Sequence, residues 1–451
     1  REILSCNLQN YGAINWLTNN NIAYIDSYAR QGVVKSLVLD SGEIKQLYDD
    51  QEYTPQALIY SVRNKKLAIT VHDQMQNTSL VVFNTETQTT DHVQLDVPAE
   101  YSDYLWWDPN WHPLEDTLLV SAGSSLFEID LNGVFTEYPV TSVSDIYNPV
   151  YHPDGNKIVA VMGGVDFDIE EYNFQKNNVA EEGTSTLSSE MSSEITIEKI
   201  RTVHHSTVMD SQAKYQPQTG SISFVSERSG EQQIWFSQNT QLKQLSHFDT
   251  NTHINSYVWS LDGQSLALAI KGKLQLLTLN GQAQLITTSF KVLDVYQWVD
   301  NQQVLLSITE QASGVNQNQQ RKVILFNINT GEHKVIYQGF SYWAQLDDDQ
   351  SLYYTDWDKT LHLYRDNRPT LFQPTSDTVF SSEFVLKDDQ LVLFGQGKVW
   401  RYQIKQQVLS SIDTSSKSKH IASLSDIDYA NKRVLFSVFK NARKDLVMFQ
   451  R

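Results

Sequence analysis

The chain repeats one short phrase, which in its fullest copy reads Val150-Tyr151-His152-Pro153-Asp154-Gly155-Asn156. Variants begin at Asn110, Lys214 and Val258, and each places an aromatic residue before a small or polar one and a turn-forming end. Proline pre-sets the first central position of a turn, Asp binds nearby backbone amides, and glycine takes a positive φ. A β-rich run such as Lys157–Val161 follows, so the phrase predicts a tight turn between two strands.

Looser copies of the phrase extend the pattern from end to end, with a period of about 40 to 45 residues and four short strands per unit. This period is the signature of β-propeller blades. The predicted units span 14–49, 53–97, 104–141, 146–203, 208–248, 254–289, 292–338, 340–375 and 379–414.

The tail, residues 419–451, holds three further predicted strands, roughly 421–428, 433–439 and 445–450. The N-terminal strand, within residues 1–8 and centred on Glu2–Leu8, would supply the fourth and remove an exposed sheet edge. The predicted fold class is therefore all-β, a β-propeller of about ten four-stranded antiparallel blades over 1–451, closed by its N-terminal strand. One large ring and two smaller rings both remain open, since about ten units exceed the common range of four to eight blades.

Residues 175–200 depart from the repeat. They include Glu181–Thr186 and Ser188–Glu194, and this Ser/Thr/Glu-rich composition predicts a polar insertion in the fourth unit rather than a strand of the ring. The insertion is interpreted either as a tolerated surface excursion or as a flap that contacts a partner or covers a ligand.

Charge and composition narrow the functional classes. The formal net charge of −18 argues against binding of nucleic acid or anionic lipid by this region. No run approaches the ~20 apolar residues that span a bilayer. The chain begins at Arg1 without Met or an apolar leader, which we expect of an excised or processed chain that a membrane anchor or a signal peptide would precede. Cys6 is the only cysteine, which rules out an internal disulfide.

Two residue groups are candidate sites. Alternation places Asp166, Asp168 and Glu170 on one face of an extended segment, where carboxylate oxygens could hold a hard cation; the alternative is a solvated strand edge. An aromatic group around Asp108-Pro109 could bind a peptide, a sugar or an apolar ligand, or could instead wedge between blades; its candidate residues are Tyr104, Trp106, Trp107 and Trp111. No nucleophile elbow, phosphate loop or zinc-protease motif is present, so no catalytic residue and no cofactor is predicted.

The turns Tyr151–Gly155 and Trp259–Gly263, each followed by a buried strand, resemble the Ser-Pro-Asp-Gly phrase of TolB-like β-propellers. Long arrays of this repeat that contain an insertion and start without Met, as this chain does, look like the periplasmic sensor domain of membrane-anchored winged-helix regulators of the ToxR and CadC type. In those regulators a cytoplasmic DNA-binding domain and one transmembrane helix precede the sensory domain. The resemblance implies an architecture, and it carries over no ligand-binding residue.

Three functions follow as hypotheses. The first is a non-enzymatic extracytoplasmic sensor or interaction domain, periplasmic and tethered to the inner membrane, that binds a small ligand or protein partner on a propeller face. Signalling would then require binding that discriminates between two states. The second is a free periplasmic TolB-like scaffold for protein–protein interaction. The third is the propeller domain of a prolyl-oligopeptidase-like hydrolase, whose catalytic domain would lie outside this chain.

Overall fold

The structure is a computed structural model of the 451-residue chain. It describes residues 13–28, 31–75, 77–95, 97, 109–140, 144–176, 195–249, 252–311, 319–372, 381, 383–395, 397–414 and 420–450. Every regular element within these ranges is a β-strand, which confirms the all-β prediction. No helix in them is long and apolar enough to cross a membrane. The chain divides into two compact units: residues 1–164 with 443–451, and residues 165–442.

The first unit contains three four-stranded antiparallel sheets and part of a fourth sheet. The three sheets are β1 (Ile14–Thr18), β2 (Asn21–Tyr28), β3 (Gln31–Val38) and β4 (Ile44–Tyr48); β5 (Tyr53–Ser61), β6 (Lys66–Asp73), β7 (Thr78–Asn84) and β8 (Thr89–Gln94); and β9 (Asn110–Trp111), β10 (Thr117–Ala122), β11 (Ser125–Asp130) and β12 (Phe135–Glu137). The partial sheet consists of β13 (Asp145–Tyr151), the first half of β14 (Lys157–Lys176) and the second half of β37 (Arg433–Gln450).

The second unit contains five complete sets of four antiparallel strands; four are separate sheets, and the last is joined by one parallel pair, Ile195 with Ile412, to the sheet described next. They are β16 (Asp210–Tyr215), β17 (Ile222–Ser226), β18 (Gln233–Gln238) and β19 (Gln241–Gln244); β20 (Ile254–Trp259), β21 (Ser265–Ile270), β22 (Lys273–Thr278) and β23 (Ala283–Ile286); β24 (Lys291–Trp298), β25 (Gln303–Gln311), β26 (Gln319–Asn327) and β27 (His333–Gln338); β28 (Trp343–Leu346), β29 (Leu352–Thr355), β30 (Leu361–Arg365) and β31 (Arg368–Leu371); and β32 (Phe384–Lys387), β33 (Gln390–Gly395), β34 (Lys398–Gln403) and β35 (Val408–Asp413).

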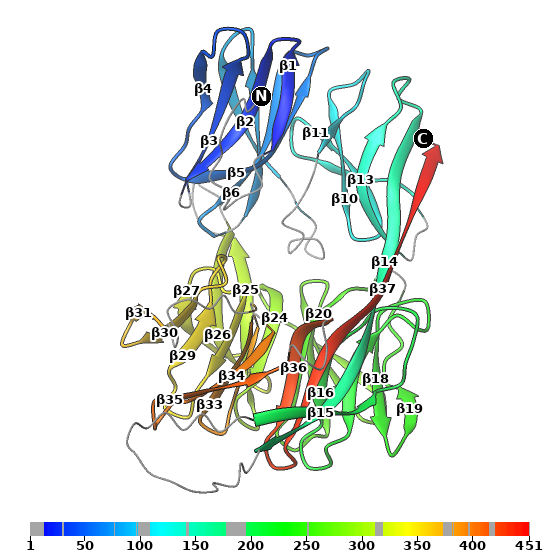
Figure 1. Ribbon diagram of the computed structural model, residues 1–451, viewed down its shortest axis with the longest axis vertical. Helices are drawn as coiled ribbons and strands as arrows, with labels where there is room; N and C mark the ends of the chain where they lie inside the picture. The colour runs from blue at the N-terminus through cyan, green and yellow to red at the C-terminus, as the bar shows by residue number, and fades with distance from the viewer. Residues whose placement is uncertain are drawn as a thin grey trace, which may run out of the picture. The chain divides into compact units, whose positions relative to one another are not determined.

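A sixth sheet of the second unit is assembled from both ends of that unit. Its strand order is β36 (Ile421–Asp428), the first half of β37, the second half of β14, and β15 (Ile195–Thr202). Figure 1 shows β14 and β37 side by side. The first strands of the six sheets contact one another in the cyclic order β16, β20, β24, β28, β32, β36 and back to β16. The ring therefore closes after six sheets, and a single ring of ten is excluded.

Eight of the nine predicted units coincide with four antiparallel strands, and the fourth unit is the exception. The tail also differs from its prediction. The fourth predicted repeat, residues 146–203, is divided between the two compact units. Its strand β14 continues through 20 residues across their boundary. The tail forms two strands, since β37 is one continuous strand of 18 residues rather than two. Closure of the ring by residues 1–8 is not shown, because these residues lie outside the described ones. Within the described residues β14 is the neighbour of β37.

The predicted insertion over 175–200 is too long at both ends. Residues 175–176 end β14, and residues 195–200 belong to β15, which pairs with β14 in the sixth sheet. Ile197 explains this difference, because its side chain is 1% exposed and packs against Tyr172 and Phe436 in the core of that sheet. Residues 177–194, with most of the polar composition, lie outside the described residues.

The repeated phrase links neighbouring sheets as well as turning the chain. The side-chain amide of Gln216 donates to the carbonyl oxygen of Gly263 at 2.7 Å, and His112 Nε2 donates to the carbonyl oxygen of Gly155 at 3.3 Å. In both pairs the third residue of one phrase reaches the glycine of a following phrase. Gly155 and Gly263 have φ of +75° and +66°, and a Cβ on Gly263 would lie 2.6 Å from a backbone oxygen, so glycine is required by both conformation and space.

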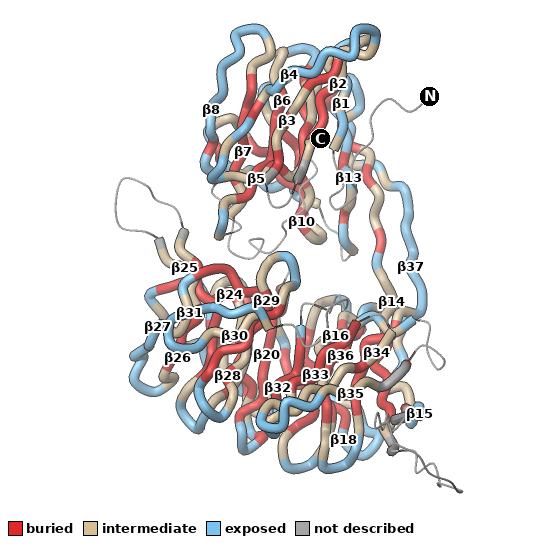
Figure 2. Tube along the Cα trace, turned by 60° about the vertical axis from the view of Figure 1, so that its left-hand side comes forward, coloured by how far each residue is buried: buried red, intermediate tan, exposed pale blue. Residues whose placement is uncertain are grey.

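Apolar side chains on both faces of the inner strands fill the space between sheets. One core joins Val225 and Ile234 of the β16–β19 sheet to Tyr257, Trp259 and Leu268 of the next sheet. Figure 2 shows the contrast between buried inner strands such as β20 and the exposed outer strand β31. Side-chain amides complete this packing: Gln297 accepts from the backbone N–H of Leu346, which lies one sheet further along the chain.

Candidate functional site

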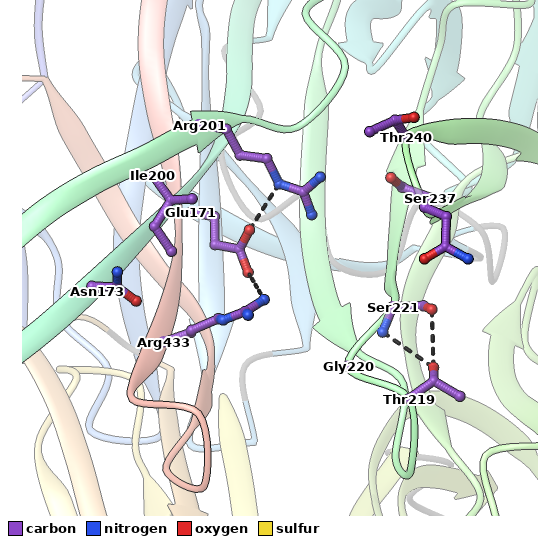
Figure 3. A pocket seen from close by; sticks show the side chains of 11 residues that line it. Glu171, Asn173, Ile200, Arg201, Thr219, Gly220, Ser221, Ser237, Thr240 and Arg433 are labelled. Atoms are coloured by element: carbon purple, nitrogen blue, oxygen red, sulfur yellow. Dashed lines mark hydrogen bonds and ion pairs between the residues drawn. The ribbon is translucent and has the colours of Figure 1, made fainter.

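A polar pocket of about 430 Å³ lies within the second unit, between the sixth sheet and the β16–β19 sheet. One wall comes from β14, β15 and β37, and the other from the β16–β17 turn, β18 and the β18–β19 turn. Figure 3 shows the two walls facing each other. The lining residues are Glu171, Asn173, Ile200, Arg201, Thr219, Gly220, Ser221, Ser237, Asn239, Thr240 and Arg433.

Glu171 organises the first wall. It lies on β14, directly opposite Arg201 on β15 in the strand register, and its side chain is only 1% exposed. Arg201 Nε donates to its Oε2 at 2.8 Å, and an η nitrogen of Arg433 on β37 donates to its Oε1 at 3.3 Å. The Tyr215 hydroxyl donates to Oε1 at 3.3 Å as well. One buried carboxylate therefore holds two guanidinium groups, which remain 37% and 41% exposed at the pocket.

Hydroxyl groups line the second wall. Thr219 and Gly220 belong to the turn of the repeated phrase that begins at Lys214. Thr219 Oγ1 lies 2.9 Å from Ser221 Oγ and also contacts the side-chain oxygen of Gln216, which links this turn to the next sheet. On β18, Ser237 Oγ is 2.9 Å from His204 Nε2. Burial, followed by the positive charges of Arg228 and Arg201, lowers the pKa of His204.

Asp168 and Glu170 of the predicted cation site lie on one face of β14, where their partners include two lysines and an imidazole. Glu170 contacts Lys199 on β15 and, at 2.5 Å, Lys440 on β37. Asp168 lies 2.6 Å from the imidazole of His205. Burial opposes ionisation of Glu170, but hydrogen bonds from Lys199, Lys440 and Tyr172 hold its pKa below its usual value.

Asp166, the third acid of that prediction, has one buried carboxylate oxygen without a hydrogen-bond partner. Burial and then the negative charge of Asp168 raise the pKa of Asp166. Within the described residues, Asp166, Asp168 and Glu170 do not bring one oxygen each within 4.8 Å of one another. A metal role for these three acids stays a prediction.

Of the four aromatic candidates, Trp111 alone lies among the described residues. Tyr104, Trp106 and Trp107 lie outside the described residues, so their proposed ligand contacts stay a prediction. Trp111 is 7% exposed, packs among side chains of two neighbouring sheets and donates from its indole nitrogen to the carbonyl oxygen of Ile59 at 3.1 Å. That placement matches the alternative of a wedge between blades.

Where the chain is described, His112, Glu115 and Glu128 of the first unit are a group whose ligand atoms gather within 4.8 Å. His112 Nδ1 accepts from the backbone N–H groups of Leu114 and Glu115, and Nε2 donates to Gly155. Both ring nitrogens therefore serve the turn and the link between sheets. Glu128 accepts from the hydroxyls of Tyr138 and Tyr151. These contacts fit a structural group better than a metal centre.

Sequence reasoning missed Glu171, Arg201 and Arg433. The available signal was the pair Glu170-Glu171 within the run Phe167–Tyr172, because two adjacent carboxylates in a strand point to opposite faces and each needs its own cationic partner when buried. No local pattern identifies those partners. Arg433 lies 262 residues beyond Glu171 in the chain, and Lys440 lies 270 residues beyond Glu170.

No protein-family model and no curated protein matches the chain. Among solved structures it is similar to the tricorn protease, with 11% identity, a TM-score of 0.27 and coverage of 87% of this chain and 43% of that one. It is similar to TolB from Acinetobacter baumannii, with 12% identity, a TM-score of 0.25 and coverage of 95% of this chain and 67% of that one. It is also similar to the acylaminoacyl peptidase of Pyrococcus horikoshii, with 12% identity, a TM-score of 0.26 and coverage of 85% of this chain and 56% of that one. The chain thus spans less than half of the tricorn protease, and these likenesses concern the fold alone.

Proposed function

We propose that this chain is a non-enzymatic recognition module that binds a small polar solute in the pocket between β14, β15, β37 and the β16–β19 sheet. The observation that carries this proposal is the arrangement of Arg201 and Arg433, both fixed on buried Glu171 and both still exposed to the pocket. Pre-positioned donors in a concave site lower the entropic cost of binding a ligand. The single carboxylate of the lining is already paired with two guanidinium groups, which makes it a poor general base.

The strands of the pocket also suggest how occupancy could be transmitted. Glu171 lies on β14 and Arg433 lies on β37, and both strands continue beyond the second unit into residues of the first. A solute that binds one arrangement of these strands better than another would shift the equilibrium between the arrangements. This supports a sensor role. We propose that the role is that of an extracytoplasmic sensor or interaction domain of a membrane-anchored transcriptional regulator, which is the form that the resemblance of the repeated turns implies.

The test is a thermal-shift screen of the full chain against a defined panel of sugars, sugar acids, sugar phosphates, amino acids and polyamines. The expected result is that at least one compound raises the unfolding midpoint of the wild type and leaves that of the R201A/R433A variant unchanged. Arg368→Ala, which removes an exposed arginine of β31, is the matched control and should respond like the wild type. The proposal fails if every shift that is seen persists in the double variant, or if the panel yields no shift.

The sensor role is tested with the compound that the screen identifies. Hydrogen exchange of the full chain should slow at residues 165–176 and 433–442, which belong to the pocket's own unit, and also change at 157–164 and 443–450. If exchange slows in the second unit alone, the chain binds the compound but the proposed transmission along β14 and β37 is wrong.

A further inference from the structure

We infer that the solute is a small organic anion that carries hydroxyl groups, in which a carboxylate or phosphate lies between Arg201 and Arg433. This inference rests on the proposed function and adds the chemical class of the ligand. It starts from the charge of the lining: two guanidinium groups face the pocket, and Glu171 is the only carboxylate among the lining residues. The lining therefore has an excess of one positive charge although the whole chain carries −18.

Two acids and one histidine lie next to the lining residues. Asp428 is close to Gly220 but is not a lining residue, and its carboxylate accepts from the side-chain and backbone nitrogens of Asn431, which carries no charge. Glu170, next to Glu171 in sequence, is bound to Lys199 and Lys440. His204, whose Nε2 contacts Ser237 Oγ, has a pKa that burial and then the positive charges of Arg228 and Arg201 lower. Among the lining residues, no second carboxylate balances the excess positive charge, so an anionic ligand would complement it.

The guanidinium groups have donors to spare. Arg201 uses Nε and Arg433 uses one η nitrogen for Glu171, and among the described residues the structure gives their other nitrogens no partner. A guanidinium presents its N–H groups as a planar fork that matches the oxygens of a carboxylate or phosphate. Glu171 holds both forks in position before the ligand arrives, so an oxyanion of either kind fits here.

The opposite wall favours hydroxyl groups on the same ligand. Ser221 and Thr240 offer hydroxyls, and Asn173 and Asn239 offer amides, whereas the buried Ser237 hydroxyl contacts His204. Ile200 is the only large apolar side chain of the lining, and the lining includes no aromatic ring on which a flat ligand could stack. A volume of about 430 Å³ lies at the lower end of ordinary ligand sites, which suits a monosaccharide-sized molecule.

Thr240 of this wall stands at a backbone position that strains it. Asn239 and Thr240 form the two-residue turn between β18 and β19, with φ of +48° and +67°. Such a turn favours Asn-Gly, because a left-handed backbone strains a β-branched residue. The chain has Thr at a position where glycine would be unstrained, and this Thr belongs to the pocket lining.

The experiment measures binding of four probes of similar ring size to the full chain by isothermal titration calorimetry: glucose, glucosamine, glucuronate and glucose 6-phosphate. The two anions should bind at least ~10-fold more tightly than glucose, because each makes charge-assisted hydrogen bonds that glucose lacks. Their affinity should fall as NaCl is raised, whereas that of glucose should not. Whichever anion binds more tightly identifies a carboxylate or a phosphate as the preferred group.

Two variants locate the effect. Arg433→Ala should weaken binding of the preferred anion by at least ~10-fold. Thr240→Val keeps the shape of the turn and leaves the contacts of Glu171 intact, so it remains informative if Arg433→Ala does not fold; it should weaken binding several-fold. Arg368→Ala should bind like the wild type.

The outcomes separate the two proposals. If glucose or glucosamine binds as tightly as the anions and Arg433→Ala weakens that binding, the recognition function stands and the anion inference is wrong. If none of the four probes binds while the wider panel yields a pocket-dependent compound without an oxyanion, the anion inference is again wrong. Anion binding that Arg433→Ala and Thr240→Val both leave unchanged would place the site elsewhere and contradict the inference.

Discussion

The carboxylate of Asp426 accepts a hydrogen bond from the backbone N–H of Tyr215 at 2.8 Å, across a separation of 211 residues. Asp426 lies on β36 and Tyr215 on β16, the last and first of the six inner strands, so this bond closes the ring of the second unit. Gln297 and Gln345 play the same part between consecutive sheets, since they accept from the backbone N–H groups of Leu346 and Leu386.

Asp426→Ala should therefore destabilise the second unit by about 1 to 3 kcal/mol, because it leaves the N–H of Tyr215 without its acceptor. Urea unfolding of the full chain, followed by tryptophan fluorescence, measures the change. Asp426→Asn retains an acceptor oxygen and should lose less. Asp348→Ala, at an exposed turn, is the control; equal losses for Asp426→Ala and Asp348→Ala would contradict a special role in closure.

Gly163 should tolerate no side chain, whereas its neighbour Gly164 should. A Cβ on Gly163 would lie 2.0 Å from the carbonyl oxygen of Arg443 on β37, while a Cβ on Gly164 meets nothing within 4 Å. Gly163→Ala must push two strands apart, with an expected loss of about 1 to 3 kcal/mol or more. Gly164→Ala should change the free energy of unfolding by less than about 1 kcal/mol. Thermal unfolding of the two variants side by side tests the close approach, and equal midpoints would refute it.

Thr240→Gly should stabilise the chain by up to about 1 kcal/mol, because glycine relieves the left-handed backbone of the β18–β19 turn. The same change removes the hydroxyl of a pocket residue and should weaken binding of the anion that the probe experiment identifies. Thr136→Gly, at an exposed strand position of β12, is expected to lower stability instead. A Thr240→Gly chain that unfolds at lower urea concentration than the wild type would show that the turn is not strained.

Asp210 should make the stability of the wild type depend on pH. It is fully buried, and burial raises its pKa from 3.8 to about 6 despite its contacts with Ser226 and, at 2.7 Å, Arg228. The folded state therefore binds this proton more tightly than the unfolded state. The stabilisation from Asp210 is complete below about pH 4 and is lost as the pH rises through about 6.

The measurement for Asp210 is the difference in free energy of unfolding between wild type and Asp210→Asn, at several pH values from 4 to 7. As the pH rises from 4 to 7, the wild type should lose up to about 3 kcal/mol of stability relative to Asp210→Asn, since the Asn side chain does not titrate. A difference that stays constant with pH would mean that the carboxyl of Asp210 titrates alike in both states.

Much of the fold could be predicted from the residues, as two kinds of local pattern show. The turn Tyr151–Gly155 and the run Lys157–Val161 depend on residues a few positions apart, so the strand that follows the turn can be found from them alone. Asp168 and Glu170 lie on one face of β14 because successive side chains of any strand alternate. The candidate pocket was not predictable in this way, since its walls come from segments that are far apart in the chain.

The sequence by itself determined the repeat, the sheets and most of their boundaries, because turn chemistry and strand alternation act between near neighbours in the chain. Tertiary structure alone decided where the ring closes, how β14 and β37 run through both units, and which cations meet the buried acids. Glu171 shows the physical reason: its carboxylate must be neutralised once it leaves water, and one of the two arginines that do so, Arg433, reaches it only because β37 pairs beside β14.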